Sequence, residues 1–188
     1  MNTLAKLLFV AMLLVPTGCY MQQNQFAAKD TRPDEMTSSI DTVTIAGAPE
    51  AVFDLITSAR FWPQWHPATK AVGGVTERPY RLGDRIYEAG RIGAQDFKTS
   101  WEVVEHARPS RVVLQSEKSS TRITYTFQSR DGHTVFSRKL EYNRKNFAAA
   151  TNAPGGAEEF MRAQSEQAVN QLKAMVEKIL REEAAGIR

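Results

Sequence analysis

Arg138 is the residue whose place in the sequence most clearly suggests binding chemistry. The run from 134 to 143 alternates apolar and polar residues, and Arg138 shares a side with Phe136, Leu140 and Tyr142. A guanidinium on an apolar face must form an ion pair, reach water, or meet an anionic or carbonyl group of a ligand. Three interpretations follow: a ligand contact, a structural ion pair with Glu88 or Glu105, or a register that turns Arg138 outward.

Aromatic residues on other predicted strands are candidates for the same kind of site. Tyr125, Tyr142 and Trp101 fall on the apolar sides of their strands. Each offers a large apolar surface with one polar atom that can orient a ligand. Packing in a closed core would use the same residues, so the pattern predicts either a pocket wall or a packed interior.

No catalytic motif or metal motif accompanies these residues. His66, His106 and His133 are the only histidines, and none has a metal-ligand spacing to another His, a Cys or clustered carboxylates. The chain has no G-x-S-x-G, and its paired glycines at 73–74 and 155–156 do not form a phosphate-binding loop. We therefore predict no catalytic residue, no metal and no cofactor.

The single cysteine has a different predicted chemistry. Cys19 follows a short basic start and the apolar run Leu7–Val15, which is too short to span a bilayer. Thr17 and Gly18 suit a lipoprotein signal, whereas Pro16 does not. We predict a signal peptide at 1–18, lipidation of Cys19 and a flexible tether at 19–37, with an ordinary secreted protein or an uncleaved anchor as alternatives. The domain would then be membrane-anchored in the cell envelope, outside the cytoplasm and periplasmic in a Gram-negative cell.

Composition points to one folded domain without a nucleic-acid partner. The chain has 188 residues, of which 42% are hydrophobic and 24% are charged, proportions typical of globular proteins. Its 24 basic and 21 acidic residues leave a net charge of only +3 and are interspersed along the whole length. No basic and aromatic interleaving suggests RNA or DNA binding.

The periodicity of the sequence predicts the elements that position these residues. A strand at 39–46 precedes a helix that starts at Pro49 and carries Val52, Phe53 and Ile56, then a short turn or helix at 61–67. Strands follow near 69–76, 84–90, 96–106, 111–117, 121–129 and 134–143, with Asp131-Gly132 as a hairpin turn. A small-residue loop at 147–156 leads to a helix from Ala157 to about Glu183, whose predicted apolar face comprises Phe160, Gln164, Ala168, Leu172, Met175, Val176 and Ile179.

This order of elements resembles the START-like, or SRPBCC, superfamily, which includes polyketide cyclases, dehydrases and lipid-transfer proteins. The resemblance is carried by 49–56, by Trp62 and Trp65, by 82–84, by 101–105 with Arg108-Pro109, and by the terminal helix. It implies an α+β helix-grip domain over 38–184, with a tail at 185–188. In such a fold about seven antiparallel strands curve around the long C-terminal helix and leave a cavity between sheet and helix.

The resemblance also implies a site and a partner. The predicted ligand-binding residues are Trp65, Trp101, Tyr125, Arg138, Tyr142, Phe160 and Gln164, and His66 is a candidate general base beside the cavity. Gln164 has solvent contact as an alternative role. The expected partner is a small hydrophobic or amphipathic ligand such as a lipid, fatty acid or polyketide-like compound. A cyclase- or dehydratase-type enzyme and a fully packed interaction domain are the alternatives.

Overall fold

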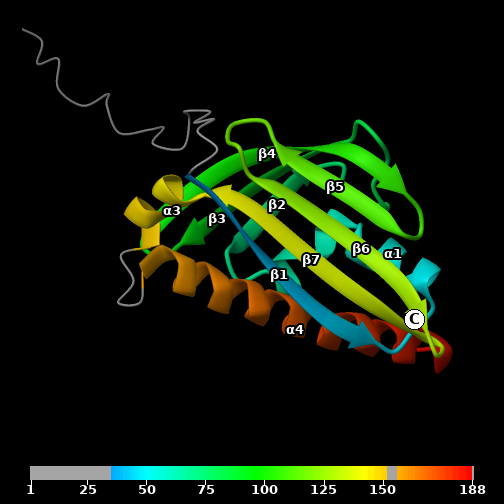
Figure 1. The fold of residues 1–188 in the computed structure, drawn as a ribbon. Coiled ribbons are helices and arrows are strands. Elements are labelled where there is room, and N and C mark those ends of the chain that lie inside the picture. Colours follow the sequence, from blue (N-terminus) through cyan, green and yellow to red (C-terminus); the bar gives the residue numbers. More distant parts are fainter. Residues whose placement is uncertain (1–34, 152–155, 188) are drawn as a thin grey trace, which may run out of the picture.

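The computed structural model describes residues 35–151 and 156–187, so the predicted signal peptide, Cys19 and most of the predicted tether lie outside the described residues. The elements, shown in Figure 1, run in the order β1 (Met36–Ile45), α1 (Pro49–Ile56), η2 (Ala59–Phe61), α2 (Trp62–Trp65), β2 (Thr69–Gly74), β3 (Arg85–Ile92), β4 (Gln95–Ala107), β5 (Arg111–Ser116), β6 (Arg122–Arg130), β7 (His133–Asn143), α3 (Arg144–Thr151) and α4 (Gly156–Ala184).

The strands form one curved antiparallel sheet. Its seven strands are ordered β1-β7-β6-β5-β4-β3-β2, so the first strand lies beside the last, and β1 and β2 are the two edge strands. The long helix α4 runs along the concave side of the sheet (Figure 1). This is the predicted α+β helix-grip architecture, which is thereby confirmed.

Local sequence signals explain two of the elements that frame the site. Pro49 occupies the first turn of α1, and Val52, Phe53 and Ile56 are the buried residues of that helix, as predicted. At the β6–β7 hairpin, Asp131 has φ of 50° and Gly132 has φ of 75°. Two consecutive residues in the left-handed region are what a tight hairpin turn requires, and Asp-Gly supplies them at low cost.

The buried face of α4 differs from the predicted face near the start of the helix. Its buried residues are Met161, Ser165, Ala168, Val169, Leu172, Val176 and Ile179, whereas Phe160 and Gln164 are only partly buried. The predicted set advanced in steps of four residues, and each such step turns about 40° past a full rotation. The buried stripe instead includes a step of three residues from Ser165 to Ala168, which brings Met161 and Ser165 onto the sheet side.

The predicted loop at 147–156 is wrong over its first half. Helix α3 extends to Thr151 and follows β7 without an intervening loop. The side-chain oxygen of Asn143 accepts a hydrogen bond from the backbone N–H of Lys145 at 2.9 Å, in the manner of a helix N-cap. This cap and the run of alanines that follows favour a helix. The predicted loop rested instead on Pro154 and the two glycines after it, which lie beyond the end of α3.

Candidate functional site

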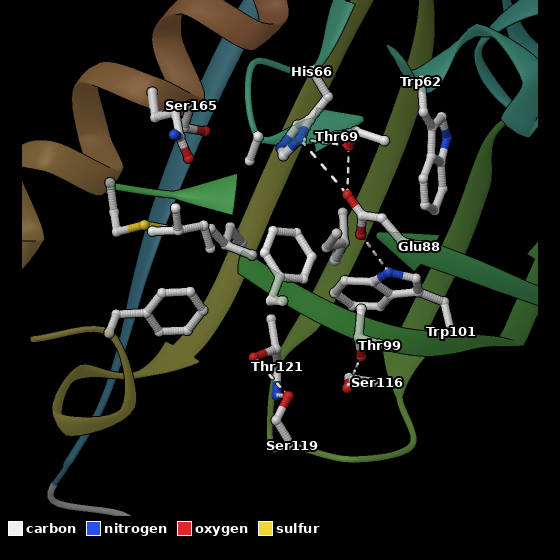
Figure 2. A pocket seen from close by; sticks show the side chains of 18 of the residues that line it. Trp62, His66, Thr69, Glu88, Thr99, Trp101, Ser116, Ser119, Thr121 and Ser165 are labelled. Carbon is white, nitrogen blue, oxygen red and sulfur yellow. Dashed lines mark hydrogen bonds and ion pairs between the residues drawn. The ribbon is translucent and has the colours of Figure 1, made fainter. Parts of the chain in front are cut away.

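A cavity of about 100 Å³ lies between the concave face of the sheet and α4. Its walls are mainly apolar and aromatic, and include Trp62, Ile92, Phe97, Ile123, Leu140 and Met161. Figure 2 shows polar side chains gathered at two ends of this space, with His66 and Ser165 at one end and Ser119 and Thr121 at the other. The cavity is therefore an apolar chamber between two polar ends.

Arg138 lies on the concave face, as the alternation of its strand predicts, and is 2% exposed. Pairing of the strands places it directly opposite Asp41 of β1 on one side and Tyr125 of β6 on the other. Its Nη1 donates a hydrogen bond of 2.7 Å to the Ser165 hydroxyl, which in turn donates to the Asp41 carboxylate. The guanidinium is therefore balanced by Asp41 through one hydroxyl group from α4.

Neither of the ion-pair partners considered from the sequence contacts Arg138. Glu105 instead accepts a hydrogen bond of 2.7 Å from Arg111. Glu88 is buried on the same side of the sheet as Arg138, but no ion pair joins the two within the described residues. Strand alternation predicted the correct face for Arg138 but not its partner, although Asp41 shares the inner side of its own strand with Val43 and Ile45.

His66, at the end of α2, connects Arg138 to the opposite wall. Its Nε2 lies 3.4 Å from Nη2 of Arg138 and its Nδ1 lies 3.0 Å from the Thr69 hydroxyl. Burial, with a smaller contribution from the Arg138 charge, lowers the pKa of His66 to about 3. Because the ring is neutral, Nε2 accepts from the guanidinium and Nδ1 carries the proton that it donates to Thr69.

Glu88 of β3 is the acceptor at the far end of this chain of hydrogen bonds. It accepts from the Thr69 hydroxyl and, at 2.8 Å, from Nε1 of Trp101. Its carboxylate also lies 4.0 Å from Nδ1 of His66, and Figure 2 shows these four side chains together. Burial raises the pKa of Glu88, while the two hydrogen bonds and the Arg138 charge act in the opposite direction.

Glu88 was considered from the sequence only as an ion-pair partner of Arg138 and was not among the predicted site residues. A usable signal was present, because Glu88 falls between Ile86 and Gly90 on the inward side of an alternating strand. Arg138 shows the same pattern, a charged residue on the apolar side of an alternating strand, and the pattern indicates a buried charge that needs a partner. The hydroxyl donor to Glu88, Thr69, has no comparable signal, because the irregular pairing of β2 with β3 determines where Thr69 lies.

Five of the seven predicted ligand-binding residues line the cavity: Trp65, Trp101, Tyr125, Arg138 and Gln164. Burial raises the pKa of Tyr125 to about 12, while the charge of Arg138 and its hydrogen bond to the phenol act in the opposite direction. The phenol is therefore neutral.

The other two predicted ligand-binding residues, Tyr142 and Phe160, do not line the cavity. Tyr142 packs its ring against Phe147, with centroids 5.0 Å apart, and the turn of α4 puts Met161 where Phe160 was expected. Contact of these residues with a ligand stays a prediction.

The second polar end of the cavity is formed by β4, β5 and the turn before β6. The hydroxyls of Thr99 and Ser116 lie 3.1 Å apart, and the Ser119 hydroxyl donates to that of Thr121 at 3.0 Å. Lys118 also lines this cavity and is exposed to solvent, so the cavity opens beside it. Lys98 borders the cavity through its place in β4, but it pairs with Ala89 on the outer face of the sheet, so its side chain points away.

Two further features bear on the kind of site. No group of three or more His, Cys, Asp or Glu residues suited to a metal ion occurs in residues 35–151 and 156–187. None of the helices described for this chain is long and apolar enough to cross a membrane.

A curved sheet that encloses an apolar, partly polar-lined cavity with a long helix defines the START-like class of ligand-binding and cyclase domains. The chain belongs to the polyketide cyclase/dehydrase and lipid transport family, whose model matches residues 36–177. The resemblance to the START-like superfamily that the sequence showed is therefore confirmed. A comparison with curated proteins gave no significant match.

Solved structures with the same fold include three informative cases. The chain is similar to the di-domain ARO/CYC BexL from the BE-7585A biosynthetic pathway, with 20% identity and a TM-score of 0.59 over 79% of this chain, and it spans about half of that protein's length (51%). It is similar to the Zhui aromatase/cyclase from Streptomyces sp. R1128, with 14% identity and a TM-score of 0.60 over 77% of this chain and 96% of that one. A START superfamily protein from Mycobacterium smegmatis gives 15% identity and a TM-score of 0.57 over 76% and 98% of the two chains. At such identities these likenesses establish the fold.

Proposed function

We propose that this chain binds a small hydrophobic or amphipathic molecule in the cavity between α4 and the sheet. One observation carries the proposal: an apolar chamber of about 100 Å³ contains a buried, hydrogen-bonded polar cluster built around Arg138 and Glu88. Apolar walls with a few convergent polar groups are the usual composition of small-molecule sites. Membership of the polyketide cyclase/dehydrase and lipid transport family supports the same proposal.

The size of the chamber limits how much of a ligand it encloses. An engineered cavity of about 150 Å³ holds one benzene molecule, so about 100 Å³ accepts a short chain or part of one ring. A larger ligand must extend into the opening beside Lys118. A lipid with long acyl chains therefore suits the cavity less well than a compact molecule.

Acid–base catalysis is the second candidate function, and the Glu88–Thr69–His66 arrangement favours it. Burial raises the pKa of Glu88 and keeps His66 neutral, which gives one carboxyl group and one imidazole within 4.0 Å of each other at the cavity wall. In this function Glu88 would take or give a proton, and Arg138 would polarise a carbonyl group. A Glu88→Gln variant that keeps ligand affinity but loses proton exchange at the ligand's acidic C–H position would establish it.

We also propose that the domain is tethered in the cell envelope by a lipid on Cys19. The support is the sequence alone: a short apolar run that ends at the only cysteine, followed by a polar segment. The tether would hold the cavity near a membrane, where amphipathic molecules concentrate.

Filling the cavity tests the binding proposal. Ile123 is a buried cavity residue of β6, and Ile123→Phe should occupy the chamber and abolish binding of indole measured by saturation-transfer NMR. Thr126→Phe adds the same ring to the outer face of that strand and is the matched control. Indole binding that survives Ile123→Phe unchanged would show that the ligand site lies elsewhere.

A further inference from the structure

We propose that the cavity takes a small alkylammonium cation, whose charged nitrogen lies against the Glu88 carboxylate and the aromatic rings near it. This inference rests on the proposed binding function and names the charge and the size class of the ligand. Three features of the cavity carry it: the charges of the buried cluster, the composition of the walls and the volume of the chamber.

Hydrogen bonding identifies Glu88 as an ionised carboxylate. A guanidinium only donates, so Nε2 of His66 must accept from Arg138 and Nδ1 must donate to the Thr69 hydroxyl. Thr69 therefore donates its own proton to one Glu88 oxygen, while Nε1 of Trp101 donates to the other. A protonated carboxyl group would need an acceptor of its own, and neither oxygen has one among the described residues. Burial raises the pKa of Glu88, but these two donors and the Arg138 charge favour the ionised form.

The buried cluster around Glu88 carries one negative charge in excess. Its two carboxylates, Asp41 and Glu88, are accompanied by a single cation, Arg138. His66 is neutral, because its ring accepts from the guanidinium. The Ser165 hydroxyl joins Arg138 to Asp41, whereas no Lys or Arg in the described part of the chain forms an ion pair with Glu88. A buried carboxylate is costly without a compensating cation, so a cationic group of a ligand is its complement.

Aromatic rings form part of the cavity wall near Glu88. All three tryptophans of the chain, Trp62, Trp65 and Trp101, line the chamber together with Tyr125. Trp101 donates to Glu88, and Figure 2 shows its ring beside that carboxylate. The face of an aromatic ring attracts a cation, tryptophan most strongly, and aromatic cages bind alkylammonium groups in this way. The wall therefore favours the same charge as the buried cluster does.

The volume of the chamber selects a small cation. An engineered cavity of about 150 Å³ holds one benzene molecule, so about 100 Å³ encloses roughly four non-hydrogen atoms. Propylammonium has this size. Its short alkyl chain suits the apolar part of the wall, which includes Ile123 and Leu140.

Three small probes of similar size test the charge of the ligand. We would titrate the isotope-labelled full chain with propylammonium, 1-propanol and propanoate, and follow the indole N–H signals of its three tryptophans by NMR. Propylammonium should bind about tenfold tighter than 1-propanol, because a hydrogen bond to a charged group is roughly twice as strong as a neutral one. Propanoate should bind weakest. Potassium ion is the inorganic control and should leave the indole N–H signals unchanged.

Two matched substitutions assign the preference to Glu88. Glu88→Gln keeps the shape and removes the charge, so the affinity for propylammonium should fall about tenfold, to that for 1-propanol. The affinity for 1-propanol should itself stay unchanged. Glu102→Gln makes the same change on the outer face of β4, where Glu102 pairs with Arg85, and should bind all probes as the wild type does. If Glu88→Gln does not fold, the order of affinities in the wild type decides alone.

The outcomes distinguish this inference from the proposed function. Binding of 1-propanol as tight as that of propylammonium, with both lost in Ile123→Phe, would overturn the inference and leave the binding function in place. A response to potassium equal to that to propylammonium, or an ammonium preference that survives Glu88→Gln unchanged, would also overturn it. Failure of every probe to move the N–H signals would overturn it as well, and titration with free indole would then test the proposed function on its own.

Discussion

Asp41 and Arg138 face each other across β1 and β7, and the Ser165 hydroxyl of α4 connects their side chains. The pair thus ties the first strand, the last strand and the long helix together at one buried point. It also explains how a guanidinium that is 2% exposed is tolerated in an apolar interior.

Replacement of Arg138 should be costly for stability. Arg138→Met removes the cation and leaves Asp41 and Glu88 with buried or partly buried carboxylates that lack a positive neighbour, so we expect a loss of about 3 to 5 kcal/mol in the free energy of unfolding. Urea unfolding measures it, with Arg122→Met on the outer face of β6 as the control. Wild-type stability in Arg138→Met would mean that the Asp41–Ser165–Arg138 connection contributes little to the fold.

The neutral state of His66 should make the fold sensitive to moderate acid. The folded pKa of about 3 lies below the ordinary value of 6.5, so below about pH 6.5 the unfolded chain binds a proton that the folded chain does not. Stability should therefore fall as the pH falls, by about 2 kcal/mol between pH 7 and pH 5 from this group alone. The groups that face the ring are Arg138 and, at 4.0 Å, Glu88.

Comparison with His66→Gln isolates that contribution. Glu88 acts in the opposite direction, because its raised pKa means that the folded chain takes up this proton at a higher pH than the unfolded chain does, and it is present in both proteins. The variant should lose about 2 kcal/mol less than the wild type over the same pH interval. His133→Gln, at the exposed β6–β7 turn, serves as the control. Identical pH dependence of unfolding in wild type and His66→Gln would contradict a buried neutral imidazole.

The two ends of α4 should differ in their contribution to stability. Leu172 is fully buried, so Leu172→Ala should cost about 2 to 5 kcal/mol through lost contacts and a new cavity. Gln164 is partly exposed and borders the ligand cavity, so Gln164→Ala should change stability by less than about 0.5 kcal/mol. Thermal unfolding of the two variants decides between them, and equal losses would mean that α4 is packed uniformly along its length.

Much of the fold follows from local patterns in the sequence. The strand alternation placed Tyr125 and Arg138 on the inner face, and Asp131-Gly132 marked the hairpin, because side-chain period and turn geometry act over a few residues. The site depends on longer connections. Ser165 lies 124 residues from Asp41 and 27 from Arg138, and nothing in its neighbours indicates which helix face it occupies. A shift of one residue on α4 separates the predicted Phe160 and Gln164 from the buried Met161 and Ser165.

The predicted lipid anchor is tested by a single substitution outside the described residues. If Cys19 is acylated, Cys19→Ser should move the protein from the membrane fraction to the soluble fraction or block its maturation. Fractionation and gel mobility measure the result, with Ser39→Ala in β1 as a control that leaves the predicted signal intact. A Cys19→Ser protein that stays in membranes with unchanged mobility would show that the apolar run itself is the anchor.

Native mass spectrometry of the purified full chain tests the central claim most directly. A cavity that binds a compact amphiphile should retain one during gentle purification, so the wild-type spectrum should contain a species heavier by one small molecule, released on collisional activation. The same species should be missing from Ile123→Phe, in which the added ring fills the chamber, and present in Thr126→Phe. A bound mass that persists in Ile123→Phe, or a wild type that carries and accepts no small molecule, would contradict a ligand site between α4 and the sheet.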